Sequence, residues 1–171
     1  YPHKRESVGK PLPGMQVRID NSDTDGVGEI HLMGPMVMTG YINKEPIDGD
    51  FNTDDIGYID EEGFVYILNR RKDLIISGGE NIYPKELEDL VYTLPSVKEC
   101  AVVPVPDTKW GQVPALFVAF HDGKSLPPED IIVFMKDYLA KYKIPKYVKV
   151  LTALPRNGTG KILRNKLKFE N

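Results

Sequence analysis

Two different sequence patterns meet at the segment Arg70-Arg71-Lys72-Asp73-Leu74-Ile75-Ile76-Ser77-Gly78-Gly79-Glu80-Asn81-Ile82-Tyr83-Pro84. It begins with four charged side chains, continues with a short apolar run typical of a strand, and ends with two glycines before a proline that favours a helix start. Polar residues without apolar periodicity are typical of a linker between units. We therefore expect the chain to divide within residues 69–73.

Upstream of this segment the sequence predicts short strands and no long helix. Three β-prone stretches are bounded by turn residues: Val17–Ile19, Gly28–Leu32 and Phe64–Leu68. Such a pattern favours a small β-barrel-like or sandwich-like unit. The polar stretch Phe51–Asp55 is expected to be a loop between two strands.

Downstream, helical and strand patterns alternate. Apolar residues after Pro84 recur at helical spacing until Pro95, and Pro127-Pro128 opens a second helix that is expected to run to about Tyr142. Strands are expected over residues 97–105, 113–120 and 147–151, and a short helix at the end. The sequence therefore predicts an α+β fold, with a small β-barrel-like unit followed by an α+β domain of about 100 residues.

Composition excludes several classes of protein. The 171 residues are 41% apolar and 27% charged, which is ordinary for a folded protein. We expect no membrane span, because no run of about 18 apolar residues occurs. Cys100 is the one cysteine and no Cys/His group has zinc spacing, so neither a disulfide framework nor a metal-ligand set is expected. A reducing cytoplasm is the expected location.

Basic side chains are concentrated near the C-terminus. Residues 136–168 contain ten Lys or Arg and one acid, Asp137, although the whole chain has a net charge of -3. This asymmetry favours a polyanionic ligand such as a nucleotide or coenzyme. A solvated amphipathic tail explains it equally well. Nucleic acid is not expected, because the Arg density and regular stacking aromatics of known modules are missing.

The first candidate site is the loop expected around Asp54 and Asp55. A loop carboxylate can accept hydrogen bonds from both hydroxyls of a ribose, and a charged acceptor strengthens them. The alternative is an Asx-type turn, which Asn and Asp side chains commonly form.

The second candidate site is Ser77-Gly78-Gly79. Without Cβ atoms, adjacent glycines let the backbone approach a ligand closely. The dinucleotide fingerprint G-x-G-x-x-G is absent, and an ordinary tight β-turn is the alternative.

The third candidate site is Lys161, which follows Gly158-Thr159-Gly160. A Walker motif is excluded, because Pro155 and Ile162 occupy positions that need Gly and Ser or Thr. A lysine on a glycine-bracketed loop can still bring a positive charge to a developing anion. An ordinary surface lysine is the alternative. The single tryptophan, Trp110, is either a core cap or a stacking platform.

Together these segments, in this order, resemble the adenylate-forming acyl-CoA synthetase superfamily over essentially the whole chain. The resemblance also includes the Arg70-x-Lys72-Asp73 segment and Trp110-Gly111-Gln112. Within the superfamily, residues 74–84, 110–114 and 139–145 are most similar to o-succinylbenzoate–CoA ligases of menaquinone biosynthesis. Fatty-acyl-CoA and 4-chlorobenzoate-type ligases share most of these segments, and a non-catalytic CoA-binding module is a further alternative.

The resemblance implies an enzyme with two half-reactions. A small carboxylic acid attacks ATP, supplied with Mg²⁺, to give acyl-AMP and pyrophosphate; the CoA thiol then displaces AMP. It implies the following roles: Lys161 is the catalytic lysine of the first step, Asp55 and Arg70 hold the ribose, and Lys72 is the hinge for a mobile C-terminal domain. It further implies that CoA meets Ser77, Gly78, Gly79, Trp110, Tyr142, Lys143 and Lys146.

The resemblance also implies how the chain divides into domains and that it carries only part of a ligase. Residues 1–69 match the closing β subdomain of the N-terminal ligase domain, 70–73 the hinge and 74–171 the C-terminal domain. The superfamily's phosphate loop and acyl pocket do not occur in this sequence, so this fragment alone is expected to be inactive. Asp54 departs from the superfamily, which usually has glycine at this position of the turn.

Overall fold

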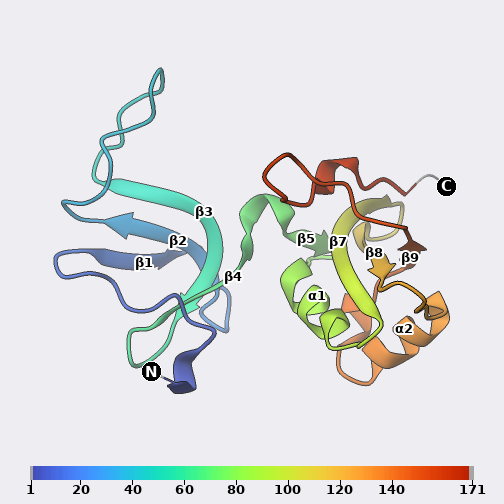
Figure 1. Ribbon diagram of the computed structural model, residues 1–171. Coiled ribbons are helices and arrows are strands. Elements are labelled where there is room, and N and C mark those ends of the chain that lie inside the picture. The colour runs from blue at the N-terminus through green and yellow to red at the C-terminus, as the bar shows by residue number, and fades with distance from the viewer. Residues whose placement is uncertain (1, 170–171) are drawn as a thin grey trace. The chain divides into compact units, whose positions relative to one another are not determined.

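The computed structural model describes residues 2–169 and divides the chain into two compact units after Lys72 (Figure 1). Each unit has its own sheet. The division falls inside the charged segment that sequence indicates as a linker. The finer boundaries at 1–69, 70–73 and 74–171 remain predictions.

The first unit is an antiparallel sheet in the order β1-β2-β3-β4. Its elements are the short 3-10 helix η1 (Pro2–Lys4), β1 (Gln16–Asp20), β2 (Gly28–Met33), β3 (Asp50–Ile59) and β4 (Val65–Arg70). Residues 34–49, between β2 and β3, extend away from the sheet (Figure 1). The three strands expected from the sequence are confirmed, but the described strands form an open sheet and not a closed barrel.

The expectation of a loop at Phe51–Asp55 was wrong, because these residues lie within β3. Two register shifts explain how a polar, turn-like sequence fits a strand. One falls between Glu29 and His31 on β2, and the other between Ile56 and Gly57 on β3. Such bulges leave extra residues unpaired and redirect side chains, so the strand can hold left-handed backbone.

The second unit is a sheet built around the long hairpin of β7 (Val97–Asp107) and β8 (Gly111–Phe120). On its other side β8 pairs with β5 (Ile75–Ser77) near Gly111 and in parallel with β9 (Tyr147–Val150) further along. β5 in turn pairs with β6 (Glu80–Ile82). The 3-10 helix η2 (Arg71–Asp73) precedes β5.

Two layers cover the two faces of this sheet (Figure 1). Helices α1 (Pro84–Tyr92) and α2 (Pro128–Lys136) cover one face and bury Leu87, Val91, Ile131 and Met135. The segment after β9 covers the other face with Leu154 and Leu167. Successive residues of a strand point to opposite faces of the sheet, so β7 and β8 contribute side chains to both cores. This explains why their sequences are almost continuously apolar.

Most elements expected in the second unit are confirmed, with one difference in length. Helix α2 ends at Lys136 and not near Tyr142, and the 3-10 helices η3 (Lys141–Lys143) and η4 (Arg164–Lys166) follow. The longer helix was expected because Tyr138 falls at the apolar spacing of a helix. In the structure its side chain is 67% exposed and does not face the core. None of the helices within residues 2–169 is long and apolar enough to cross a membrane.

Candidate functional site

In the first unit, strand pairing brings together the two residues expected to hold a ribose. Asp55 on β3 is directly opposite Arg70 on β4. Arg70 Nε forms an ion pair with Asp55 Oδ1 at 2.9 Å, and Arg70 Nη1 donates to the Thr53 carbonyl at 3.1 Å. The Asp55 side chain is 14% exposed and that of Arg70 is 56% exposed. A half-exposed guanidinium beside a carboxylate presents both donors and acceptors to a polar ligand.

Asp54 adopts the left-handed conformation that a glycine would take, with φ of 59°. The Asn52 side chain accepts a hydrogen bond from the Asp54 N–H at 2.8 Å, which is an Asx turn. Thr53 Oγ1 accepts from the Asp55 N–H and donates to the Ile30 carbonyl. The Asx turn and the Asp55–Arg70 pair therefore coexist, and Asp54 preserves the turn.

A buried carboxylate that the sequence did not point to supports this turn from behind. Glu29 is 8% exposed and accepts hydrogen bonds from Asn52 at 2.7 Å and from Asn21 at 3.3 Å. It also pairs with Arg71 at 3.0 Å. Glu29 lies on β2, opposite the bulge. Because acidic side chains are usually exposed, the pattern of apolar residues in the sequence does not mark this one as buried.

In the second unit, Gly78-Gly79 form the turn between β5 and β6. The Gly78 N–H donates to the Trp110 carbonyl at 2.9 Å, and Ser77 pairs with Gly111, so two separate sequence motifs meet here. Gly78 has φ of 60°, and a Cβ there would lie 2.6 Å from Cε3 of the Trp110 ring. Gly79 has φ of 93° with open space around it. The first glycine thus accommodates the indole, and the second leaves its surroundings open to a ligand.

This turn borders a groove of about 1060 Å³ that lies entirely within the second unit. Its lining includes the predicted residues Ser77, Gly78, Trp110, Tyr142 and Lys146, but not Gly79 or Lys143. Three charged side chains that the sequence did not single out also line it: Glu80, Lys136 and Lys141. Trp110 and Tyr142 are 47% and 43% exposed, so both rings face solvent in part.

The two lysines predicted to meet CoA phosphates both have carboxylate partners. Lys143 Nζ contacts the two oxygens of Glu86 at 2.7 and 2.8 Å, and Lys146 Nζ contacts Asp107 at 2.6 Å. Asp107 also accepts from the N–H groups of Lys109 and Trp110. The Lys146 ammonium, followed by these two N–H groups, lowers the pKa of Asp107 to about 2.

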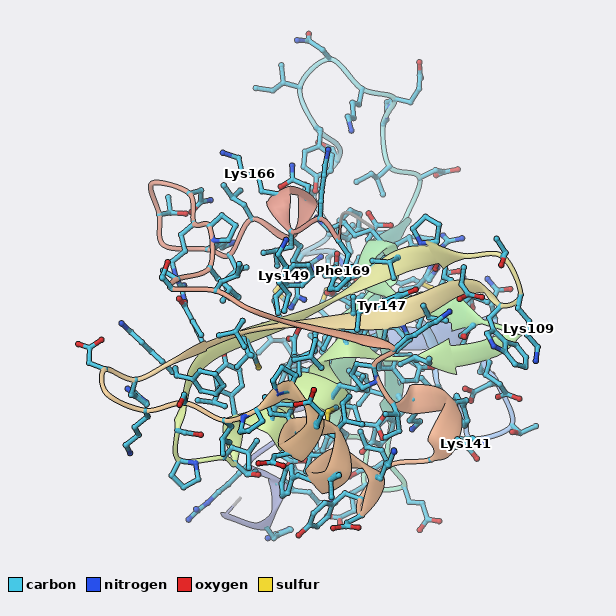
Figure 2. All side chains as sticks on the ribbon, turned by 90° about the vertical axis from the view of Figure 1, so that its right-hand side faces the viewer. Lys109, Lys141, Tyr147, Lys149, Lys166 and Phe169 are labelled. Carbon is cyan, nitrogen blue, oxygen red and sulfur yellow. The ribbon has the colours of Figure 1, made fainter. Side chains whose placement is uncertain are left out.

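The basic C-terminal stretch does not form one continuous positive surface. Within residues 2–169, four of its ten basic residues form ion pairs with acids of the second unit: Lys143, Lys146, Arg156 and Arg164. Figure 2 shows Lys109 and Lys141 on one side of the second unit and Lys149, Lys166 and Phe169 on another. Lys149 Nζ is 5.9 Å from the centre of the Phe169 ring. The positive charge that faces the groove is therefore only part of the asymmetry in the sequence.

Lys161 lies at the end of a short hairpin on the face of the sheet opposite the helices. An isolated bridge joins Arg156 to Ile162, and Asn157 exchanges backbone hydrogen bonds with Lys161 and Gly160. The Asn157 side chain accepts from the N–H groups of Thr159 and Lys161. Lys161 is exposed and forms no ion pair with any residue in the 2–169 range.

The described residues offer no fitting site for Mg²⁺. The one group of metal-ligating side chains close together in residues 2–169 is Asp20, His31 and Asp50 in the first unit. The Arg18 guanidinium already donates to both of these aspartates, at 2.5 to 2.7 Å. A cation there would be repelled by the guanidinium, so no step below is assigned to a metal held by this chain.

Comparison with known protein families gives a match to residues 86–161, within the second unit. They match the AMP-binding enzyme C-terminal domain. The second unit carries that domain. The resemblance to adenylate-forming ligases is thereby confirmed.

Relatives extend the similarity over both units. The 2-succinylbenzoate–CoA ligase of Lactococcus lactis subsp. lactis is 54% identical over 168 residues, which are 98% of this chain and 36% of that protein. The enzyme of that name from Bacillus cereus is 47% identical over 95% of this chain. The chain spans about a third of the length of these curated relatives.

A solved structure agrees. The o-succinylbenzoate–CoA synthetase of Bacillus subtilis, in complex with the acyl-adenylate intermediate OSB-AMP, has a TM-score of 0.89 and 42% identity. The match covers 99% of this chain and 37% of that one. A fatty acyl CoA synthetase of Mycobacterium tuberculosis has a TM-score of 0.67 and 37% identity. The α+β class predicted from the sequence is confirmed by these matches.

Proposed function

We propose that this chain is the C-terminal part of an ATP-dependent acid–CoA ligase that acts on 2-succinylbenzoate. The observation that carries the proposal is the 54% identity to a 2-succinylbenzoate–CoA ligase over 98% of the chain. That span includes the first unit as well as the second. A shared C-terminal domain alone would support the ligase family but not this acid.

In the first half-reaction, Lys161 supplies positive charge where negative charge develops. Its ammonium would stabilise the carboxylate and the α-phosphate of ATP as acyl-AMP forms and pyrophosphate leaves. The support is its exposed place on a hydrogen-bonded hairpin without an ionic partner in residues 2–169. Asp55 and Arg70 would hold the ribose, as their pairing across β3 and β4 supports.

In the second half-reaction, the groove of the second unit would hold CoA. Ser77, Gly78 and Gly79 would border the pantetheine arm, and the open space at Gly79 supports this role. Trp110 and Tyr142 would pack against apolar or adenine surface. Lys143 and Lys146 would meet phosphates only by exchanging Glu86 and Asp107 for the ligand, whereas Lys136 and Lys141 have no ion pair to break with residues 2–169.

Lys72 would be the hinge between the two half-reactions. It is exposed, lies in η2, and is the last residue of the first unit. Lys72→Pro in the complete ligase fixes its φ and restricts Arg71, so thioester formation should slow about tenfold more than acyl-AMP formation. Lys72→Ala is the control that removes the charge but keeps backbone freedom. An unchanged ratio of the two rates would contradict the hinge role.

The proposed function is tested by AMP release from the complete ligase that contains this chain. 2-Succinylbenzoate should give CoA-dependent AMP release, and benzoate and medium-chain fatty acids should give little. Preference for another acid would keep the ligase chemistry and reject the substrate. No AMP release with any acid would reject the ligase itself.

The 171-residue chain allows a separate test of CoA binding. Trp110 is its single tryptophan and lines the groove, so its fluorescence reports directly on occupancy. Titration with CoA should change the emission and weaken with added salt, because phosphate contacts are screened. Dephospho-CoA is the matched ligand that separates the 3′-phosphate from the rest. An emission spectrum unchanged by CoA would remove the groove from the proposed function.

A further inference from the structure

Two buried carboxylates contact the segment that carries Lys161, one on each side of the lysine. The first is Glu99, which is 6% exposed and lies at the start of β7. Its Oε1 accepts from the Leu154 N–H at 2.9 Å, and its Oε2 accepts from Nε and Nη2 of Arg156. Arg156 Nη1 then donates to the Gly160 carbonyl at 2.5 Å. One guanidinium therefore links a buried acid to the residue beside Lys161.

The second carboxylate is Glu88 on α1, which is 8% exposed. Arg164 donates to its two oxygens at 2.5 and 2.8 Å, and donates to the Val102 carbonyl at 2.9 Å. Glu88 also accepts from the Val102 N–H at 2.7 Å. Arg164 Nε lies 3.9 Å from Asp73, the first residue of the second unit.

The Glu88–Arg164 and Glu99–Arg156 pairs differ in the further hydrogen bonds that they make. Glu88 and Arg164 satisfy both polar backbone groups of Val102 on the side of β7 that does not pair with β8, so they also protect a sheet edge. Within residues 2–169, the Glu99 carboxylate accepts hydrogen bonds only from the backbone of Leu154 and the side chain of Arg156. Burial would raise the pKa of Glu99, but the Leu154 N–H and Arg156 lower it below its usual value. Glu99 is therefore a charged acceptor for both partners.

We propose that Glu99 and Glu88 are positioning residues for Lys161, each fixing one end of the hairpin that carries the lysine. The inference rests on the proposed role of Lys161 in acyl-AMP formation. Between the anchors, the hairpin is held by the Asn157 turn and by the Arg156–Ile162 bridge, and Ile162 packs half-buried against the core of this face. Without the arginine–carboxylate pairs the segment would be attached mainly through the apolar contacts of Leu154, Ile162 and Leu167, and no ion pair to the core would fix the two ends of the hairpin.

The test measures the two half-reactions separately in the complete ligase. Acyl-AMP formation is followed by pyrophosphate release without CoA, and thioester formation by CoA consumption with supplied acyl-AMP. Glu99→Gln keeps the shape of the side chain but removes its charge, and Arg156→Gln removes the partner. Each should lower kcat for acyl-AMP formation by about 10- to 100-fold, because small misplacements of a catalytic group have effects of this size. Thioester formation and the KM for ATP should stay within about twofold.

Controls distinguish positioning from general damage. Asp89→Asn removes the exposed Lys85–Asp89 pair on α1 and should leave both steps unchanged. The double variant Glu99→Gln/Arg156→Gln should be no slower than either single variant, because both act through one contact. Glu88→Gln should lower acyl-AMP formation and also stability, since Val102 loses its charged partner. Equal loss of both steps in the Glu99 and Arg156 variants, or no loss in either step, would overturn the proposal.

A failure of the proposed function can be recognised in the same experiment. If Lys161→Ala keeps acyl-AMP formation, the role of Lys161 is wrong and the positioning role fails with it. If Lys161→Ala is inactive and Glu99→Gln is not impaired, only the positioning role fails. Amide hydrogen exchange in the 171-residue chain needs no substrate: residues 157–161 should exchange at least about tenfold faster in Arg156→Gln. Unchanged exchange would overturn the proposal even if Glu99→Gln does not fold.

Discussion

The two units hold their candidate site residues by different means. In the first, Asp55 and Arg70 are opposite each other on paired strands, so backbone register alone brings them together. In the second, Lys161 lies outside the sheet on a hairpin that the Arg156 side chain links to Glu99, and Trp110 lies in the turn between β7 and β8, where the Asp107 side chain accepts from its N–H. A site set by register tolerates local change, whereas a site set by single side chains depends on each of them.

The largest effect is expected at Lys161, the side chain to which the proposed function assigns the first half-reaction. Lys161→Ala in the complete ligase should reduce acyl-AMP formation by about 100- to 1000-fold, the size typical for losing a transition-state charge partner. Thioester formation from supplied acyl-AMP should be spared. Lys166→Ala, an exposed lysine on the same segment, is the control. Equal loss of both steps would remove the role assigned to Lys161.

Apolar periodicity predicted most of the fold, and it failed where polar residues take structural roles. The runs over residues 97–105 and 113–120 predict β7 and β8 correctly, because strands buried on both faces are continuously apolar. Phe51–Asp55 was expected to be a loop because its sequence is typical of a turn. The residues are turn-like because a bulge places Asp54 in left-handed backbone within the strand. Local sequence does not encode the partner strand that makes it part of β3.

For the candidate site, sequence indicated the residues but not their supports. Gly78 and Trp110 are 32 positions apart, and only the β5–β8 pairing shows that the glycine accommodates the indole. Glu99 and Arg156 are separated by 57 positions. A buried acid in a strand gives no periodic signal, and its partner is found only from the fold.

The next largest effect is expected at Gly78 and Gly79 in the second unit. Variants of these two residues test whether contact with the Trp110 side chain explains the need for glycine. Gly78→Ala places a Cβ 2.6 Å from the Trp110 ring at positive φ, so the second unit should lose about 2–4 kcal/mol of unfolding free energy. Gly79→Ala has open space and only the backbone strain, about 1 kcal/mol. Urea unfolding followed by Trp110 fluorescence measures both. Equal losses would mean that contact with Trp110 does not explain Gly78.

Acid should release Trp110 only at low pH, where Asp107 becomes protonated. Because the folded pKa of Asp107 is lowered to about 2 from an ordinary 3.8, its contribution is complete above about pH 4 and is lost as pH falls through about 2. Trp110 emission should be constant from pH 7 to 4 and change below pH 3. Asp107→Asn should flatten that change. A transition centred at pH 4 or above in the wild type would contradict the pairing of Asp107 with Lys146.

The smallest effect is expected at Asp54, where register dominates. Glycine would relieve the left-handed strain of about 1 kcal/mol but would gain a similar amount of freedom in the unfolded chain. Asp54→Gly should therefore change the unfolding free energy by less than about 0.5 kcal/mol and leave the KM for ATP unchanged or slightly lower. Asp54→Ala keeps the strain without a polar side chain and should be the more destabilising variant. Thermal unfolding and ATP kinetics measure both.

The Asp54 pair of variants also tests the comparison between the units. The Asn52 side chain binds the backbone N–H of residue 54, which every substitution except proline retains. Asp55 stays opposite Arg70 as long as β3 and β4 remain paired. A large loss of ATP use in Asp54→Gly would therefore show that the Asp54 carboxylate itself contacts the substrate. In that case the first unit, like the second, would depend on a single side chain that strand register does not set.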